Sequence, residues 1–171
     1  TQVNTFPDHP FASYFSGNAE FGSDDNLLLR ASSGGGDDDL SYLLSVSHQE
    51  ADDYSLADNF NGELNQPAGD RLNSDFERES VFLSLDAQRT PIGHTSFFYN
   101  LSDAEKGLPP TAGVEDPDFE RLTKSTRQSV GLSNQFTAIP LAAKLYYNTY
   151  DSELTVYTDD SYAEVDEVEK S

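Results

Sequence analysis

A two-residue alternation of apolar and polar side chains constrains the fold of this chain more than any other sequence feature. In the run at residues 40–46 the apolar side chains share every second position: Leu40, Tyr42, Leu44 and Val46. Such a period indicates a strand that buries one face. The segment 81–86 repeats the pattern with Val81, Leu83 and Leu85, and residues 95–101 follow after a Pro-Gly turn that predicts a hairpin.

Further short segments at 135–139, 141–148 and 153–158 complete six or seven expected strands. Two places favour helix instead. Pro117 after Asp116 suits the first turn of a helix that would run to about Ser129, and Ser102 with Glu105 suits one short helical turn. The fold class expected is therefore mainly β, an antiparallel β-sandwich or barrel with long loops and one or two short helices.

The chain divides into three expected parts. Residues 1–25 contain Pro, Gly and scattered aromatics and are predicted to form an extended arm, residues 26–158 one β-rich domain with a long acidic loop at 48–75, and residues 159–171 an acidic tail. Exposed aromatic side chains on a free arm favour association. The predicted assembly contacts are the aromatics of the arm: Phe6, Phe11, Tyr14, Phe15 and Phe21.

Charge excludes some partners. The chain has 31 acidic and 10 basic residues and a net charge of −21, of which residues 1–69 carry −11 and residues 151–171 carry −7. This field repels the phosphates of nucleic acids and anionic lipids, so no direct nucleic-acid binding is expected. No apolar run reaches the ~18 residues that a membrane helix needs, and the chain is expected to be soluble without membrane insertion.

The basic residues are concentrated in the middle of the chain, between the two acidic ends. Six of the eight basic residues in residues 70–150 are Arg71, Arg78, Arg89, Arg121, Lys124 and Arg127. Two interpretations remain open. Neighbouring carboxylates such as Glu77 and Glu120 neutralise them locally, or the acidic arm of one subunit meets the basic middle of the next and orients assembly.

Catalytic motifs are missing. No serine lies in a Gly-x-Ser-x-Gly elbow, the glycines at 34–36 precede three aspartates rather than a phosphate-binding lysine, and His9, His48 and His94 have no metal-ligand spacing. Cysteine is absent, which removes disulfides and thiolate sites. We expect no enzyme and no cofactor. Zinc is disfavoured by the dispersed histidines, and the metal that suits the chain is calcium, with Asp37, Asp38 and Asp39 as candidate ligands in a loop.

These observations predict a noncatalytic structural or interaction protein that forms or decorates a larger homo- or hetero-oligomeric assembly. A virion capsid or tail accessory protein, or a subunit of a surface layer or filament, would have this organisation, which favours a virion or extracellular location. The alternatives are an acidic DNA mimic and a secreted calcium- or carbohydrate-binding β-domain. The excess of Asp over Glu also suggests a halophilic or marine environment and stabilisation by salt.

Overall fold

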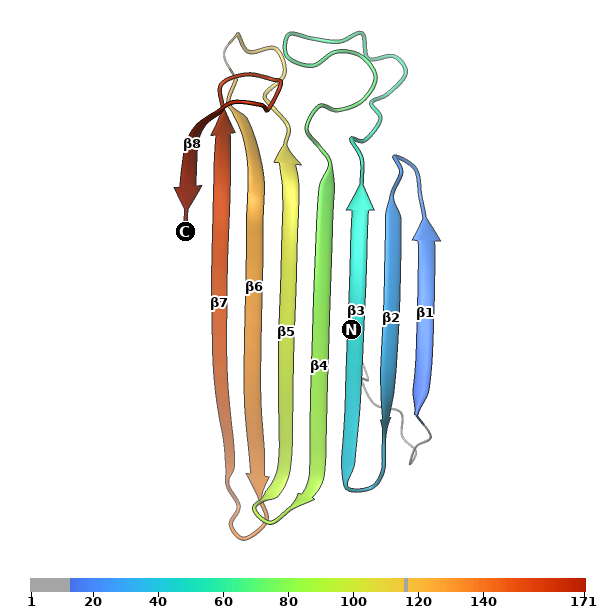
Figure 1. Cartoon of the computed structure of the whole chain (residues 1–171), viewed down its shortest axis with the longest axis vertical. Helices are drawn as coiled ribbons and strands as arrows, with labels where there is room; N and C mark the ends of the chain where they lie inside the picture. Colours follow the sequence, from blue (N-terminus) through green and yellow to red (C-terminus); the bar gives the residue numbers. More distant parts are fainter. Residues whose placement is uncertain (1–12, 116) are drawn as a thin grey trace.

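The computed structural model describes residues 13–115 and 117–171, which form one open sheet of eight antiparallel strands in chain order. Figure 1 shows the strands side by side, from β1 at one edge to β8 at the other. The strands are β1 (Tyr14–Phe21), β2 (Leu27–Gly36), β3 (Leu40–Ala51), β4 (Phe76–Thr90), β5 (Gly93–Leu108), β6 (Phe119–Phe136), β7 (Ala142–Tyr157) and β8 (Val165–Lys170).

Four of the strands are unusually long. β4 to β7 contain 15 to 18 residues each, whereas strands in globular proteins average about five or six. At one end of the sheet the connections are short, as at Pro91 and Ile92 between β4 and β5. At the other end long loops join β3 to β4 and β5 to β6 (Figure 1). The all-β class and the hairpin across residues 90–93 are confirmed.

The expected helices are wrong. The segment 117–129 belongs largely to β6, and residues 102–105 lie inside β5. Phe119 and Leu122 are three residues apart, which resembles one face of a helix. A bulge between Leu122 and Lys124 inserts an extra residue into β6, and this shifts the apolar alternation that a regular strand would show.

The described strands form one open sheet. A sandwich would have a second layer and a barrel would be closed, so neither of those arrangements is confirmed. The expected arm overlaps β1, whose residues 14–21 pair with 27–34 of β2; residues 1–12 lie outside the described range. The expected tail contains β8, which pairs with the upper part of β7. The expected loop at 48–75 begins later, after β3 ends at Ala51.

Burial is slight, as a single layer requires. Leu43 is the one large hydrophobic side chain that is buried among the described residues. Other buried side chains lie in the long loops, among them Gln66, Asn73 and Pro110. Asn73 donates hydrogen bonds to the carbonyls of Leu108 and Glu120, which fixes the loop before β4 against β5 and β6. No membrane-spanning helix is found within the described residues.

Candidate functional site

One face of the sheet carries an apolar band. The strand register sets its members in adjacent rows, because Leu44 lies opposite Leu83, which lies opposite Tyr99. The rows continue through Val130 to Tyr147 on β7. The apolar band comprises Leu40, Tyr42, Leu44, Val46, Val81, Leu83, Leu85, Phe97, Tyr99, Leu101, Val130, Leu132, Leu145 and Tyr147. We call this side of the sheet the band face and the other the polar face.

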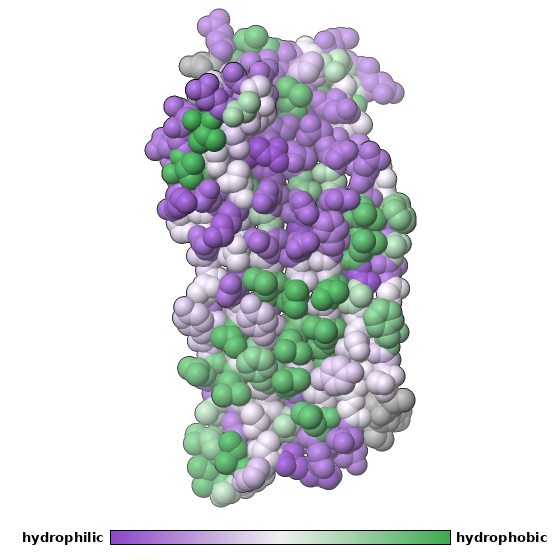
Figure 2. Space-filling view, viewed as in Figure 1, coloured by the Kyte–Doolittle hydropathy of each residue, from purple (hydrophilic) through white to green (hydrophobic). Residues whose placement is uncertain are grey.

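The apolar band has no charged residue within it. From the row of Val46 to the row of Leu40, the remaining positions of β3 to β7 on the band face are Ala87, Thr95, Gln128, Asn134, Ala143 and Thr149. Charged residues make up 24% of the chain. Leu145 and Tyr147 are 69% and 65% exposed, so the described residues do not cover them. On the face in view, Figure 2 shows hydrophobic residues gathered over the lower half, with hydrophilic residues over the upper half and at the lower end.

Above the apolar band, the same face carries a belt of acidic side chains. Glu77 on β4 lies directly opposite Glu50 on β3 and Glu105 on β5, and Glu79 lies opposite Asp103. We name these five residues the carboxylate belt. Like charges directly opposite each other on neighbouring strands destabilise a sheet. Repulsion within the carboxylate belt therefore destabilises the sheet, and salt or a bound cation would reduce this repulsion.

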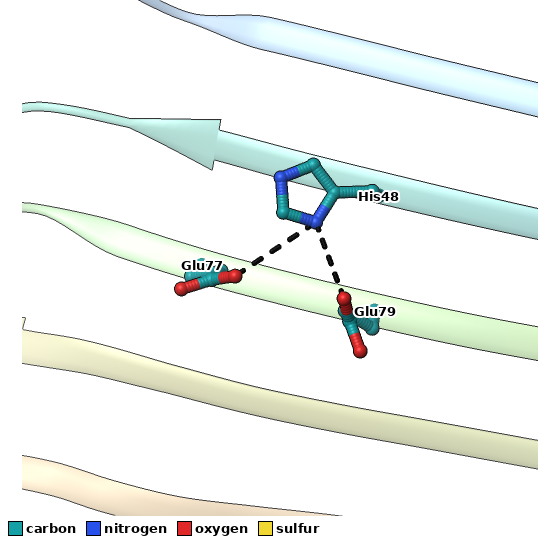
Figure 3. Close-up of side chains that lie close together, drawn as sticks. All are labelled: His48, Glu77 and Glu79. Atoms are coloured by element: carbon teal, nitrogen blue, oxygen red, sulfur yellow. Dashed lines mark ion pairs between the residues drawn. The ribbon is translucent and has the colours of Figure 1, made fainter.

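His48 lies inside the carboxylate belt. Its Nδ1 atom is 3.8 Å from Oε1 of Glu77 and 3.5 Å from Oε1 of Glu79, and its Nε2 atom is 3.3 Å from Oε2 of Glu50. Figure 3 shows both carboxylates of β4 approaching the same ring nitrogen from the neighbouring strand. One nitrogen and two carboxylate oxygens that lie within 4.8 Å of one another form a possible ligand set for a divalent cation. All three residues are at least partly exposed.

A second cluster, on the polar face, contains Ser96, His94 and Asp86. His94 Nε2 is 2.8 Å from Oδ2 of Asp86, and Ser96 donates a hydrogen bond of 2.8 Å to the same oxygen. Ser96 Oγ is 3.4 Å from the same Nε2 atom. In a Ser-His-Asp triad the serine and the aspartate use opposite ring nitrogens of the histidine. This cluster therefore lacks the triad geometry. Its hydrogen bonds join β4 to β5 within the hairpin that the two strands form.

The predicted metal ligands lie in the turn between β2 and β3. Asp37 accepts hydrogen bonds from the backbone N–H groups of Asp39 and Leu40, both at 2.9 Å, and this lowers the pKa of Asp37. Asp39 forms an ion pair with Arg89 at 3.1 Å. The bonds of Asp37 and Asp39 stabilise a turn, and calcium binding there stays a prediction.

The predicted assembly contacts are only partly described. Phe6 and Phe11 lie outside the described residues. Phe15 and Phe21 project from edge strand β1 and are 77% and 80% exposed. Tyr14 lies against Gly34 of β2, where an added Cβ atom would come within 2.5 Å of its ring. The role of these residues in assembly stays a prediction.

Sequence reasoning missed the apolar band and the carboxylate belt. Each strand was predicted from the alternation within its own segment. The sequence of one segment does not show which of its residues lie opposite which residues of the neighbouring strand. The signal that could have found the band is the common phase of the alternation, which ends in acidic residues at Glu50, at Glu77 and at Asp103. No protein-family model, curated protein or solved structure matches this chain.

Proposed function

We propose that this chain is a noncatalytic structural protein of a larger assembly, in which the hydrocarbon of a lipid bilayer covers the apolar band. The observation that carries the proposal is the continuous, uncharged and exposed apolar surface across five neighbouring strands. An exposed apolar patch of this extent marks a site of association with a protein or a membrane.

The dimensions of the apolar band support lipid as the occupant. On β3 it runs over the seven residues from Leu40 to Val46, and on β5 the same rows cover the seven residues from Thr95 to Leu101. At ~3.4 Å per residue these segments are about 24 Å long. Apolar surfaces of strands that lie in bilayers are about 25 Å tall. Only every second residue needs to be apolar, so a sheet can contact lipid without the continuous apolar run that a helix requires.

The uniformity of the band also favours lipid over a protein partner. Protein interfaces combine an apolar centre with a polar rim, and they contain about one hydrogen bond per 100–200 Å². The apolar band offers few such groups, whereas hydrocarbon needs none. The carboxylate belt adjoins the band on one side, where it would lie at the level of the headgroups and water. Because the chain carries −21, the lipid that suits it has headgroups without net negative charge.

The sheet edges explain why the proposal includes an assembly. Within the described residues β1 pairs only with β2, and β8 pairs only with residues 153–157 at the upper end of β7. Unpaired backbone groups cost several kcal/mol each in hydrocarbon, so these edges need strands from further copies or from a partner chain when lipid covers the band. Phe15 and Phe21 lie at the edge where such a strand would pair.

A single tryptophan tests the contact with lipid, because the chain contains none. Leu145→Trp places a fluorophore in the apolar band, and Asn148→Trp places the matched control on the polar face of the same strand. Each variant is mixed with phosphatidylcholine vesicles that contain brominated acyl chains. We expect quenching and a blue-shifted emission for Leu145→Trp and much weaker quenching for Asn148→Trp. Equal quenching at both positions, or none at Leu145→Trp, contradicts the proposal.

Flotation with the same lipid, unbrominated, measures the strength of the contact. Leu145→Asp introduces a charge into the band at a cost of about 2 kcal/mol, which corresponds to a roughly thirty-fold weaker partition. Asn148→Asp adds the same charge on the polar face and should float like the unmodified chain. Circular dichroism before the mixing separates a failure to fold from a failure to bind. Band-dependent oligomers that form equally well without lipid would assign the apolar band to a second copy instead.

A further inference from the structure

We propose that the polar face holds a binding site for a doubly charged oxyanion of the phosphate class, formed by Arg78, Lys106 and Arg127. The site is separate from the apolar band, because the three side chains project from the opposite face of the sheet. For the basic middle of the chain, the sequence left two interpretations open, local neutralisation by carboxylates and contact with another subunit. The site gives part of this segment a ligand instead.

The strand register brings the three cations together around a small residue. Arg78 on β4 lies opposite Ala104 on β5, and Lys106 follows Ala104 by two positions on the same face. Arg127 on β6 lies opposite Ser102, two positions before Ala104. Arg78 and Arg127 are therefore separated by one intervening strand, about 10 Å across the sheet. Both guanidinium groups can extend over Ala104 from opposite sides.

A hollow of about 350 Å³ lies between these side chains. Its walls include the three cations together with Gln49, Ser102, Ser125 and Tyr150. The small side chain of Ala104 also lines it. The volume accommodates a phosphate group and part of the molecule that bears it.

Within the described residues, no carboxylate forms an ion pair with these three cations. Among the ion pairs within 4.0 Å in residues 13–115 and 117–171, none involves Arg78, Lys106 or Arg127. Glu77 and Glu105 also contribute to the lining of the hollow, but the alternation of the strands places their side chains on the band face. In a chain of −21, three cations that face the same hollow without an ion-pair partner are an unusual arrangement.

The other groups at the hollow suit an oxyanion. The guanidinium carbon of Arg127 lies 5.0 Å above the ring of Tyr150, which orients the arginine by a cation–π contact. Hydrogen bonds from Ser152 and Ser125, and then the positive charge of Arg127, lower the pKa of the Tyr150 hydroxyl. Arginine forks bind phosphate oxygens in pairs, lysine adds a point charge, and Ser102 and Ser125 supply hydroxyl donors.

A titration of the full chain with inorganic phosphate tests the site. Calorimetry at constant ionic strength, with chloride as the competing anion, should give saturable binding by the unmodified protein. Arg78→Gln combined with Arg127→Gln should weaken binding at least ten-fold. Lys144→Gln, which removes a cation from the polar face of β7 away from the hollow, should bind as the unmodified protein does.

An NMR titration locates the bound ion even if the double variant does not fold. Phosphate should shift the backbone amide signals of Ser102, Ala104 and Ser125 together and with one dissociation constant. The proposal is overturned if phosphate and chloride shift the signals equally, if the shifted signals lie elsewhere, or if Lys144→Gln weakens binding as much as the double variant does. Because the site faces away from the apolar band, failure of lipid binding leaves this test unaffected.

Discussion

Arg121 donates two hydrogen bonds to the carboxylate of Asp75, at 2.8 and 2.5 Å, across the loop that precedes β4. The same guanidinium donates a third, at 2.7 Å, to the side chain of Asn73. Asp75 stands immediately before β4 and Arg121 lies near the start of β6, so the contact fixes the loop end of three strands, β4 to β6. In a sheet with almost no buried hydrophobic side chain, polar contacts of this kind determine where the long loops lie.

Asp75→Asn should destabilise the protein by about 1–2 kcal/mol, a value reduced from that of a buried charged pair because Asp75 is one-third exposed. The hydrogen bonds from Arg121 lower the pKa of Asp75 below its ordinary value of 3.8. A lowered folded-state pKa contributes stability that is present above the unfolded-state pKa and lost as the pH falls through the folded one. Chemical denaturation at several pH values measures this. The difference between the variant and the unmodified protein should be full above about pH 5 and shrink below pH 4. A difference that grows in acid contradicts the assignment.

Asn73→Ala should cost about 2–3 kcal/mol, because it removes both donors to the carbonyls of Leu108 and Glu120. Asn73 also has a φ of 53°, a left-handed conformation that asparagine adopts more readily than alanine. Asn73→Gly separates the two effects, since glycine accepts this backbone conformation but forms no side-chain bonds. Urea denaturation should rank the stabilities as unmodified protein, Asn73→Gly and Asn73→Ala. Equal stability of all three would mean that the loop does not depend on Asn73.

Gly131→Ala should destabilise the sheet by about 1–3 kcal/mol, because an added Cβ atom would lie within 2.1 Å of the ring of Phe98. The ring lies over Gly131 on the polar face, where Phe98 is opposite it in the register. In a Phe98→Ala background the same substitution should be neutral or stabilising. A double-mutant cycle with thermal melts measures this coupling. Additive effects of the two changes would show that the ring does not occupy this position.

Salt should raise the melting temperature, because the carboxylate belt sets Glu77 opposite both Glu50 and Glu105. Glu77→Gln removes one member of each like-charge pair and should stabilise the protein by up to about 1 kcal/mol at low salt. It should also reduce the dependence on salt. Glu169→Gln on β8 removes the same charge away from the belt and serves as the control. If both variants respond to salt alike, net charge rather than the belt determines the response.

The alternation at residues 40–46 and 81–86 correctly predicted strands, since each segment alone contains the period that a half-covered strand requires. The prediction failed for the helix expected from Pro117 to about Ser129. Phe119 and Leu122 in this segment are three residues apart, as on one helical face, but in β6 the two side chains lie on opposite faces of the strand, and the bulge that follows disguises the alternation. A bulge leaves no distinct mark in a single segment, because the extra residue is recognised only against the partner strand.

The sequence by itself determined the β class, the excess of negative charge and the positions of several strands, because these depend on composition and on side chains one or two residues apart. Only the tertiary structure decided that the strands form one open layer. It also decided that Glu50, Glu77 and Glu105 form a row and that Arg78 and Arg127 face one hollow. The physical reason is the register. A shift of one residue between two strands moves every side chain of one strand to the opposite face of the sheet. The hydrogen bonds that fix the register join residues that are far apart in the chain, so no single segment determines it.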